Sequence, residues 1–86
     1  MTDAFVMNYI NKKIAESENE NFIKYSFYEL KVKNNLTDEE ISKFLKINKD
    51  FFENKGYNVY FTDAQYTYNN SRRIVQPNEL MIAIKE

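Results

Sequence analysis

The clearest hydrophobic pattern in this chain lies between Thr37 and Gly56. Thr37 and Glu40 have the spacing of a capping box, in which each side chain bonds the backbone N–H of the other residue at the start of a helix. Gly56 is the only glycine in 86 residues and stands where such a helix would end. The pattern predicts a helix over Asp38–Lys55. Its apolar residues recur at helical spacing and should be buried: Ile41, Phe44, Leu45 and Phe52, with Phe51 beside them.

A second helix is predicted near the N-terminus, from Asp3 to Ala15. Val6, Ile10 and Ile14 recur every four residues and form one apolar stripe. Thr2 is a suitable N-cap for this helix. The polar stretch that follows, Glu16–Asn21, has no apolar residue and is typical of a solvated connection.

The stretch Phe22–Lys33 has two interpretations. In its second half, Tyr28, Leu30 and Val32 alternate with charged residues, which is the period of a half-buried strand. The first half alternates in the opposite phase, so a bulge near Ser26–Phe27 would join the two halves. A helix is the rival interpretation, because some apolar residues also share a helical face. These are Ile23, Phe27 and Leu30. We favour the strand.

The C-terminal third predicts a hairpin and a last strand. Tyr57–Thr62 alternates as a strand does, and the alternation can continue through Tyr66 and Tyr68. Asn69-Asn70-Ser71 is a turn signal, after which Arg72–Gln76 would return as the second arm.

Pro77 and Asn78 then interrupt the pattern, and Leu80–Lys85 alternates again as the last strand. We expect Leu80, Ile82 and Ile84 to face the core, with Met81, Ala83 and Lys85 on the opposite side.

The predicted architecture is a single α+β domain over residues 1–86, with one sheet packed against two helices. The element order is helix, strand, helix, strand, strand, strand. If Phe22–Lys33 is instead helical, the order becomes three helices and a hairpin, which is the topology of a winged helix-turn-helix. A chain of this length makes one domain and has a thin core.

Composition argues against ordinary enzyme chemistry. The chain has no cysteine and no histidine, which removes disulfides, thiolate metal sites and the commonest general base. A single glycine allows no phosphate-binding glycine loop. We therefore predict that the protein is not an enzyme, with no catalytic residues, no cofactor and no metal site. No apolar run is long enough to cross a membrane, and the N-terminus lacks the basic region of a signal peptide, so a cytoplasmic location is predicted.

The charged clusters favour structural roles. Asp38, Glu39 and Glu40 form the densest acidic cluster, but consecutive helical residues point in different directions, so the cluster is typical of a helix N-terminus. Lys43, Lys46 and Lys49 are spaced at three and should lie on a solvated helix face. The formal net charge is −1, without the basic excess that duplex-binding proteins usually carry.

The hairpin carries the best candidate binding residues. If the strand from Tyr57 is unbroken, its later tyrosines share one face, and two arginines follow the turn. Tyrosine and arginine are enriched at protein-binding hot spots, and the same residues also stack on single-stranded nucleic acid. The predicted partner-binding residues are Tyr60, Tyr66, Tyr68, Arg72 and Arg73.

Three segments resemble small proteins of phages and mobile elements in low-GC Gram-positive bacteria. They are Tyr28–Thr37, Gly56–Thr62 and Val75–Ile84, and the likeness extends over about Phe22–Lys85. The resemblance carries no assigned activity and no functional residue with it. It implies a small accessory protein in the cytoplasm of a bacterial host.

The favoured function is therefore protein–protein binding by a phage or mobile-element accessory protein. A host protein is the expected partner, and inhibition of a host defence system such as a CRISPR effector is the implied role. The alternative is a nucleic-acid-binding regulator of transcription or replication of winged-helix type. An exposed tyrosine face is also compatible with a homodimer.

Overall fold

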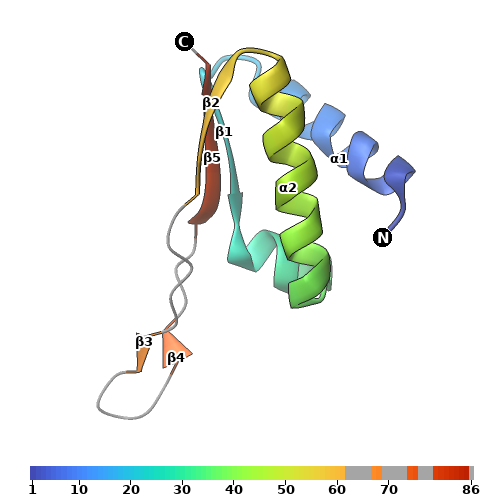
Figure 1. Ribbon diagram of the computed structural model, residues 1–86, viewed down its shortest axis with the longest axis vertical. Coiled ribbons are helices and arrows are strands. Elements are labelled where there is room, and N and C mark those ends of the chain that lie inside the picture. The colour runs from blue at the N-terminus through green and yellow to red at the C-terminus, as the bar shows by residue number, and fades with distance from the viewer. Residues whose placement is uncertain (62–66, 69–73, 76–78, 86) are drawn as a thin grey trace.

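The structure, a computed structural model, describes residues 1–61, 67–68, 74–75 and 79–85 (Figure 1). The described elements, in chain order, are α1 (Asp3–Glu16), β1 (Phe22–Ser26), the short helix η1 (Tyr28–Lys33), α2 (Asp38–Asn54), β2 (Tyr57–Phe61), β3 (Thr67–Tyr68), β4 (Ile74–Val75) and β5 (Glu79–Lys85). The predicted α+β class and the approximate element order are confirmed.

Three strands form one antiparallel sheet in the order β1-β5-β2. The C-terminal strand β5 lies in the middle, so it pairs with both neighbours. Figure 1 shows α1 and α2 on the same side of this sheet. β3 and β4 pair with each other in a separate two-stranded ladder, as the predicted hairpin requires, while its turn at residues 69–71 lies outside the described residues.

The core lies between the helices and the covered face of the sheet. Its largest fully buried side chains include Tyr25 of β1, Phe44 and Phe52 of α2, and Met81 of β5. Tyr25 and Phe44 meet edge to face, with ring centroids 5.3 Å apart. Tyr9 of α1 packs edge to face on the same Phe44 ring, so aromatic contacts join both helices to the sheet.

The predicted capping box at the start of α2 is confirmed. The Thr37 hydroxyl oxygen accepts from the Glu40 backbone N–H at 3.1 Å, and the Glu40 carboxylate accepts from the Thr37 N–H at 3.0 Å. Gly56 follows the helix with φ = 89°, a left-handed conformation that only glycine adopts readily. The helix ends at Asn54, and Lys55 is its C-cap.

The strand predicted over Phe22–Lys33 is right for its first half and wrong for its second. The register shifts between Tyr25 and Ser26, close to the predicted bulge, and the chain then turns into η1. A reciprocal pair of side-chain bonds, which resembles a capping box, stabilises the turn one residue before Phe27, the N-cap of η1. The Ser26 hydroxyl accepts from the Glu29 N–H at 3.1 Å, and the Glu29 carboxylate accepts from the Ser26 N–H at 3.5 Å.

The predicted faces of β5 are also corrected. Met81 and Ala83 are fully buried on the helix side, whereas Ile82 and Ile84 are only partly buried. Met81 lies opposite Tyr25 and Ala83 opposite Ile23, and cross-strand neighbours share a face, so these core residues fix the inward side of β5.

Leu80 is buried as predicted, but a bulge, not the simple alternation of the strand, places it in the core. At the register shift, Met81 lies opposite Tyr25 and Glu79 lies opposite Ser26. Leu80 is therefore the extra residue of a bulge, which releases it from strict alternation.

Asn48 is the one polar residue that is fully buried among the described residues. The Tyr25 hydroxyl donates to its side-chain oxygen, and its amide nitrogen donates to the Phe44 carbonyl at 2.7 Å. The hydrogen bond between Tyr25 and Asn48 links β1 to α2 inside the apolar core.

We expect Asn48→Ala to lower the free energy of unfolding by about 2–4 kcal/mol, because it leaves the Tyr25 hydroxyl without an acceptor and opens a cavity. Tyr25→Phe should cost about 1–3 kcal/mol. Urea unfolding should show that the double variant loses less than the sum, because both changes remove the same bond. Asn54→Ala, at an exposed position near the end of the helix, is the control; strictly additive losses would contradict this account.

Candidate functional site

The face of the sheet that the helices leave open is rich in apolar side chains. Ile82 and Ile84 of β5 lie in its middle, with Phe22 of β1 opposite Ile84 and Tyr60 of β2 opposite Ile82. Tyr60 is 52% exposed, and the other three are partly buried. We call these four residues the open sheet face.

The neighbours of Tyr60 along β2 show that this face is distinct from the core. Tyr57 and Val59 pack against the core cluster, which places them on the helix side. Strand residues alternate between faces, so Tyr60 points away from the helices. An exposed tyrosine beside partly exposed isoleucines offers broad apolar area with one polar tip, the composition that anchors protein interfaces.

Of the predicted partner-binding residues, the structure places Tyr60 on the open sheet face. Tyr68 belongs to β3, where its backbone pairs with Ile74 of β4. The side chain of Tyr68 and the whole of Tyr66, Arg72 and Arg73 lie outside the described residues. The grouping of these residues with Tyr60 stays a prediction.

Phe22, Ile82 and Ile84 were not predicted from the sequence to belong to a binding surface. A usable signal was present, because all residues from Leu80 to Ile84 are apolar. Whichever face of such a strand is buried, the opposite face keeps apolar side chains. A sheet covered on one side therefore leaves an apolar row open.

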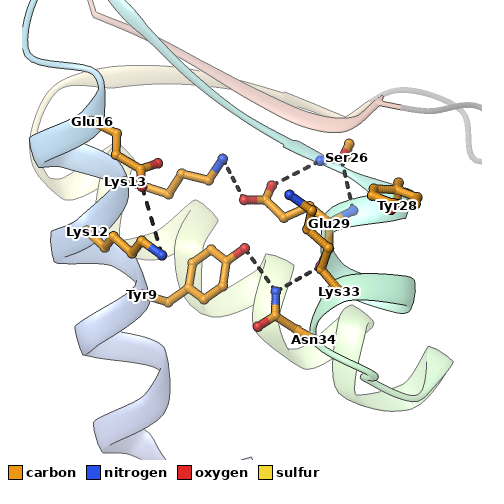
Figure 2. Close-up of a pocket in the computed structure, with 9 residues that line it drawn as sticks. All are labelled: Tyr9, Lys12, Lys13, Glu16, Ser26, Tyr28, Glu29, Lys33 and Asn34. Atoms are coloured by element: carbon orange, nitrogen blue, oxygen red, sulfur yellow. Dashed lines mark hydrogen bonds and ion pairs between the residues drawn. The ribbon is translucent and has the colours of Figure 1, made fainter.

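A polar cavity of about 510 Å³ lies on the other side of the molecule, between α1 and η1 (Figure 2). The Lys13 ammonium binds the Glu29 carboxylate at 2.7 Å and also donates to the Lys24 carbonyl at 3.1 Å. The side chains of Lys13 and Glu29 are 16% and 20% exposed, so the pair is largely withdrawn from water.

Tyr9 and Asn34 form the lower part of this cavity in Figure 2. The Asn34 amide donates to the Tyr9 hydroxyl at 3.2 Å and to the Glu29 carbonyl at 2.8 Å. Burial, together with the hydrogen bond and negative charge of Glu29, raises the pKa of Tyr9 well above its ordinary value. Burial likewise raises the pKa of Tyr25, with a smaller contribution from Glu29.

These groups bond to one another in a way that suits a structural role. A tyrosine whose pKa is raised does not supply a phenolate at neutral pH, and the Lys13 ammonium is already paired with the Glu29 carboxylate. The arrangement links α1, β1 and η1 through one polar network.

The acidic start of α2 has separate partners for its side chains. Glu40 binds the Met1 ammonium at 3.2 Å as well as the Thr37 N–H, and Asp38 binds Lys31 at 3.0 Å. Within the described part of the chain, no group of three acidic side chains comes together in a way that could hold a metal ion. The cluster therefore caps the helix.

The lysine row on α2 is partly neutralised. Lys43 pairs with Glu39 at 3.8 Å and Lys49 with Glu53 at 2.8 Å. Lys46 is exposed and has no ion-pair partner within the described ranges. One lysine of the row thus keeps a positive charge that no carboxylate in the described part of the chain compensates.

No family model, curated protein or solved structure matches this chain. Among the described residues, no helix is both long enough and apolar enough to cross a bilayer.

The raised tyrosine pKa values predict a loss of stability in alkali. In the unfolded chain Tyr9 and Tyr25 release their protons near the ordinary value of 10.0, whereas the folded protein holds these protons to higher pH. Their contribution is therefore complete below pH 10 and is lost as the pH rises above it. Urea unfolding across this range should give a shallower decline for a Tyr9→Phe, Tyr25→Phe double variant. An unchanged decline would show that these two hydroxyls do not titrate as described.

Proposed function

We propose that this chain acts by binding another protein through the open sheet face and the hairpin that continues from β2. The observation that supports this most directly is the apolar row of Phe22, Ile82, Ile84 and Tyr60 on an uncovered sheet face. Contiguous apolar surface bordered by polar residues marks interaction sites on soluble proteins. Lys24 and Asn58, both exposed, supply that polar border.

The proposed hairpin residues would extend this surface. Tyr66, Tyr68, Arg72 and Arg73 follow β2 in the chain and combine aromatic area with charge-assisted hydrogen bonding. In this proposal Tyr60 and the open sheet face supply the apolar centre, and the arginines supply polar contacts at the rim.

The proposed partner is a bacterial host protein, and the proposed origin is a phage or mobile element. The support is the resemblance carried by Tyr28–Thr37, Gly56–Thr62 and Val75–Ile84. A small protein that lacks histidine and cysteine acts most simply by occupying a surface of a larger one. Inhibition of a host defence enzyme, such as a CRISPR effector, is the specific form of this proposal.

A tagged pull-down from host lysate should recover one stoichiometric protein, with and without nuclease treatment. Tyr60→Ala should reduce its recovery by about tenfold or more, because hot-spot aromatics contribute at least about 2 kcal/mol. Tyr28→Ala is the matched control, because Tyr28 is also 52% exposed but lies on η1. Equal losses in both variants would refute the assignment of the open sheet face. Tyr66→Ala combined with Arg73→Ala tests the hairpin in the same assay.

Nucleic-acid binding is the second candidate function. One observation favours it: the second half of Phe22–Lys33 forms the short helix η1, residues 34–37 join η1 to α2, and the β3–β4 ladder follows. Three helices and a hairpin therefore occur in the chain, although alongside the β1-β5-β2 sheet, which the winged-helix alternative does not include. The lysine row would then face the nucleic acid. Against this stand Asp38, Glu39 and Glu40 in the first turn of α2, because carboxylates at that position repel phosphates.

Changing Lys43, Lys46 and Lys49 together to alanine separates the two functions. If nucleic acid is the partner, this variant should bind it more weakly and with a reduced dependence on salt, because fewer counterions are released. Fluorescence anisotropy with labelled duplex and single strands at several salt concentrations measures both quantities. If the partner is a protein, we expect the wild-type chain to show no salt-dependent binding to the duplex or the single strand. Strong salt-dependent binding of either probe would instead favour nucleic acid as the partner.

A further inference from the structure

The two edges of the three-stranded sheet differ in how well they are protected. At the β1 edge, the Lys13 ammonium donates to the Lys24 carbonyl, and the charged Lys24 side chain is itself exposed. Lysines placed at an edge prevent another strand from pairing there. The β1 edge is therefore blocked by a side chain from α1.

No described side chain protects the outer edge of β2 in this way. Lys85 of β5 donates its N–H to Asn21, on the β1 side. Backbone groups alternate along a strand, so Ile82 and Ile84 bond toward β2, where they lie opposite Tyr60 and Asn58. The N–H and C=O groups of Tyr57, Val59 and Phe61 consequently point outward.

These outward groups are ready to pair. No hydrogen bond joins them to another group among the described residues. β2 contains no charged residue and no proline, and two of its aromatic side chains are exposed: Tyr60 by 52% and Phe61 by 48%. An edge of this kind is a template for an additional strand.

A groove runs beside this edge on the helix side. It has a volume of about 300 Å³ and lies between Phe61 and the α2 residues Ser42, Leu45, Lys46 and Lys49. Leu45 and Phe61 give it apolar walls, while Lys46 contributes a positive charge that no described carboxylate neutralises. Apolar walls beside an ammonium that has no described ion-pair partner fit a side chain with an aliphatic stem and a terminal carboxylate.

We propose that the outer edge of β2 receives an extended, acidic segment of the partner protein as an added strand. This inference rests on the proposed protein-binding function and specifies the chemistry of the partner. Main-chain hydrogen bonds to Tyr57, Val59 and Phe61 give affinity, and alternate side chains give specificity. One set of side chains places carboxylates beside Lys46, and the other set places apolar groups beside Tyr60 on the open sheet face.

A second copy of this chain fits the edge less well. Its own β2 has the sequence Tyr57-Asn58-Val59-Tyr60-Phe61, which offers no carboxylate to Lys46. Pairing of two β2 edges would satisfy the backbone but leave the charge of the groove uncompensated. The charge of the groove thus favours an acidic segment over self-association.

The test uses the full chain and a short peptide of alternating glutamate and valine, acetylated and amidated at its ends. Titration followed by NMR should shift the amide signals of Tyr57, Val59 and Phe61. A peptide of alternating lysine and valine should bind more weakly. In the bound peptide, alternate N–H groups point toward β2 and away from it. N-methylation of the nitrogens that point toward β2 should weaken binding by about tenfold, because these nitrogens donate to the edge. N-methylation of the other nitrogens should have little effect.

Two protein variants complete the test. Lys46→Ala should weaken binding of the glutamate peptide roughly twofold to fivefold, whereas Lys43→Ala, which removes the same charge outside the groove, should not. The proposal is overturned if the glutamate peptide fails to bind, if both methylated peptides bind equally, or if the shifts lie at the α1–η1 cavity. Analytical ultracentrifugation of the free chain tests whether a second copy of the chain occupies the edge instead. A stable dimer that Val59→Pro disrupts would assign the edge to self-association.

Failure of this inference is distinguishable from failure of the proposed function. The outward N–H of Val59 bonds nothing in the sheet, so Val59→Pro removes an edge donor without removing a bond to β5. A host protein captured equally by wild type and Val59→Pro, yet lost with Tyr60→Ala, would overturn strand addition and leave binding through the open sheet face intact. Val59 also packs against the core, so circular dichroism must first show that Val59→Pro is folded. Loss of capture by this folded variant and by Tyr60→Ala then supports strand addition.

Discussion

The fold depends on the hydrogen bonding of β5 to both of its neighbours. β1 and β2 come from different halves of the chain and do not pair with each other, so the C-terminal strand is what makes them one sheet. The same strand supplies Met81 and Ala83 to the core, where they lie opposite Tyr25 and Ile23 of β1. The helices α1 and α2 therefore pack on this surface only when the last strand is in place. The contacts between β1 and β5 join residues that are far apart in sequence, so forming them costs loop-closure entropy.

The central position of β5 also explains the candidate binding surface. A strand that is apolar on both faces is usually covered on both, but this small domain has helices on one side of its sheet (Figure 1). Ile82 and Ile84 consequently remain partly exposed between Phe22 and Tyr60. The alternation that builds the core thus also creates the surface for which a partner is proposed.

Capping chemistry made the helices predictable. Thr37 and Glu40 defined the start of α2 from sequence, and Gly56 its end. The same Ser/Thr-x-x-Glu spacing recurs at Ser26 and Glu29, whose reciprocal bonds stabilise the turn from β1 into η1. The apolar alternation of Tyr28, Leu30 and Val32 instead favoured a strand in the sequence. In η1, Leu30 is buried whereas Val32 is 58% exposed, so these residues do not share one buried face.

Side-chain facing and three-dimensional grouping were less predictable. Periodicity gives the two faces of β5 but does not tell which one meets the helices, because both are apolar; the cross-strand positions of Tyr25 and Ile23 decide it. Asn48 falls four residues from both Phe44 and Phe52 on the buried stripe of α2, yet its partner, the Tyr25 hydroxyl, is distant in sequence. Tyr60 was selected from sequence as a binding residue, whereas the residues that surround it come from β1 and β5.

Amide hydrogen exchange of the chain, free and bound to the captured host protein, tests the central claim most directly. If the partner binds the open sheet face and the β2 edge, protection should increase at Val59 and Phe61, whose N–H groups point outward, and remain unchanged around Tyr9 and Asn34 in the α1–η1 cavity. Protection that appears at the cavity or along the outer face of α2, with β2 unchanged, would contradict the account and place the functional surface on the helical side of the molecule.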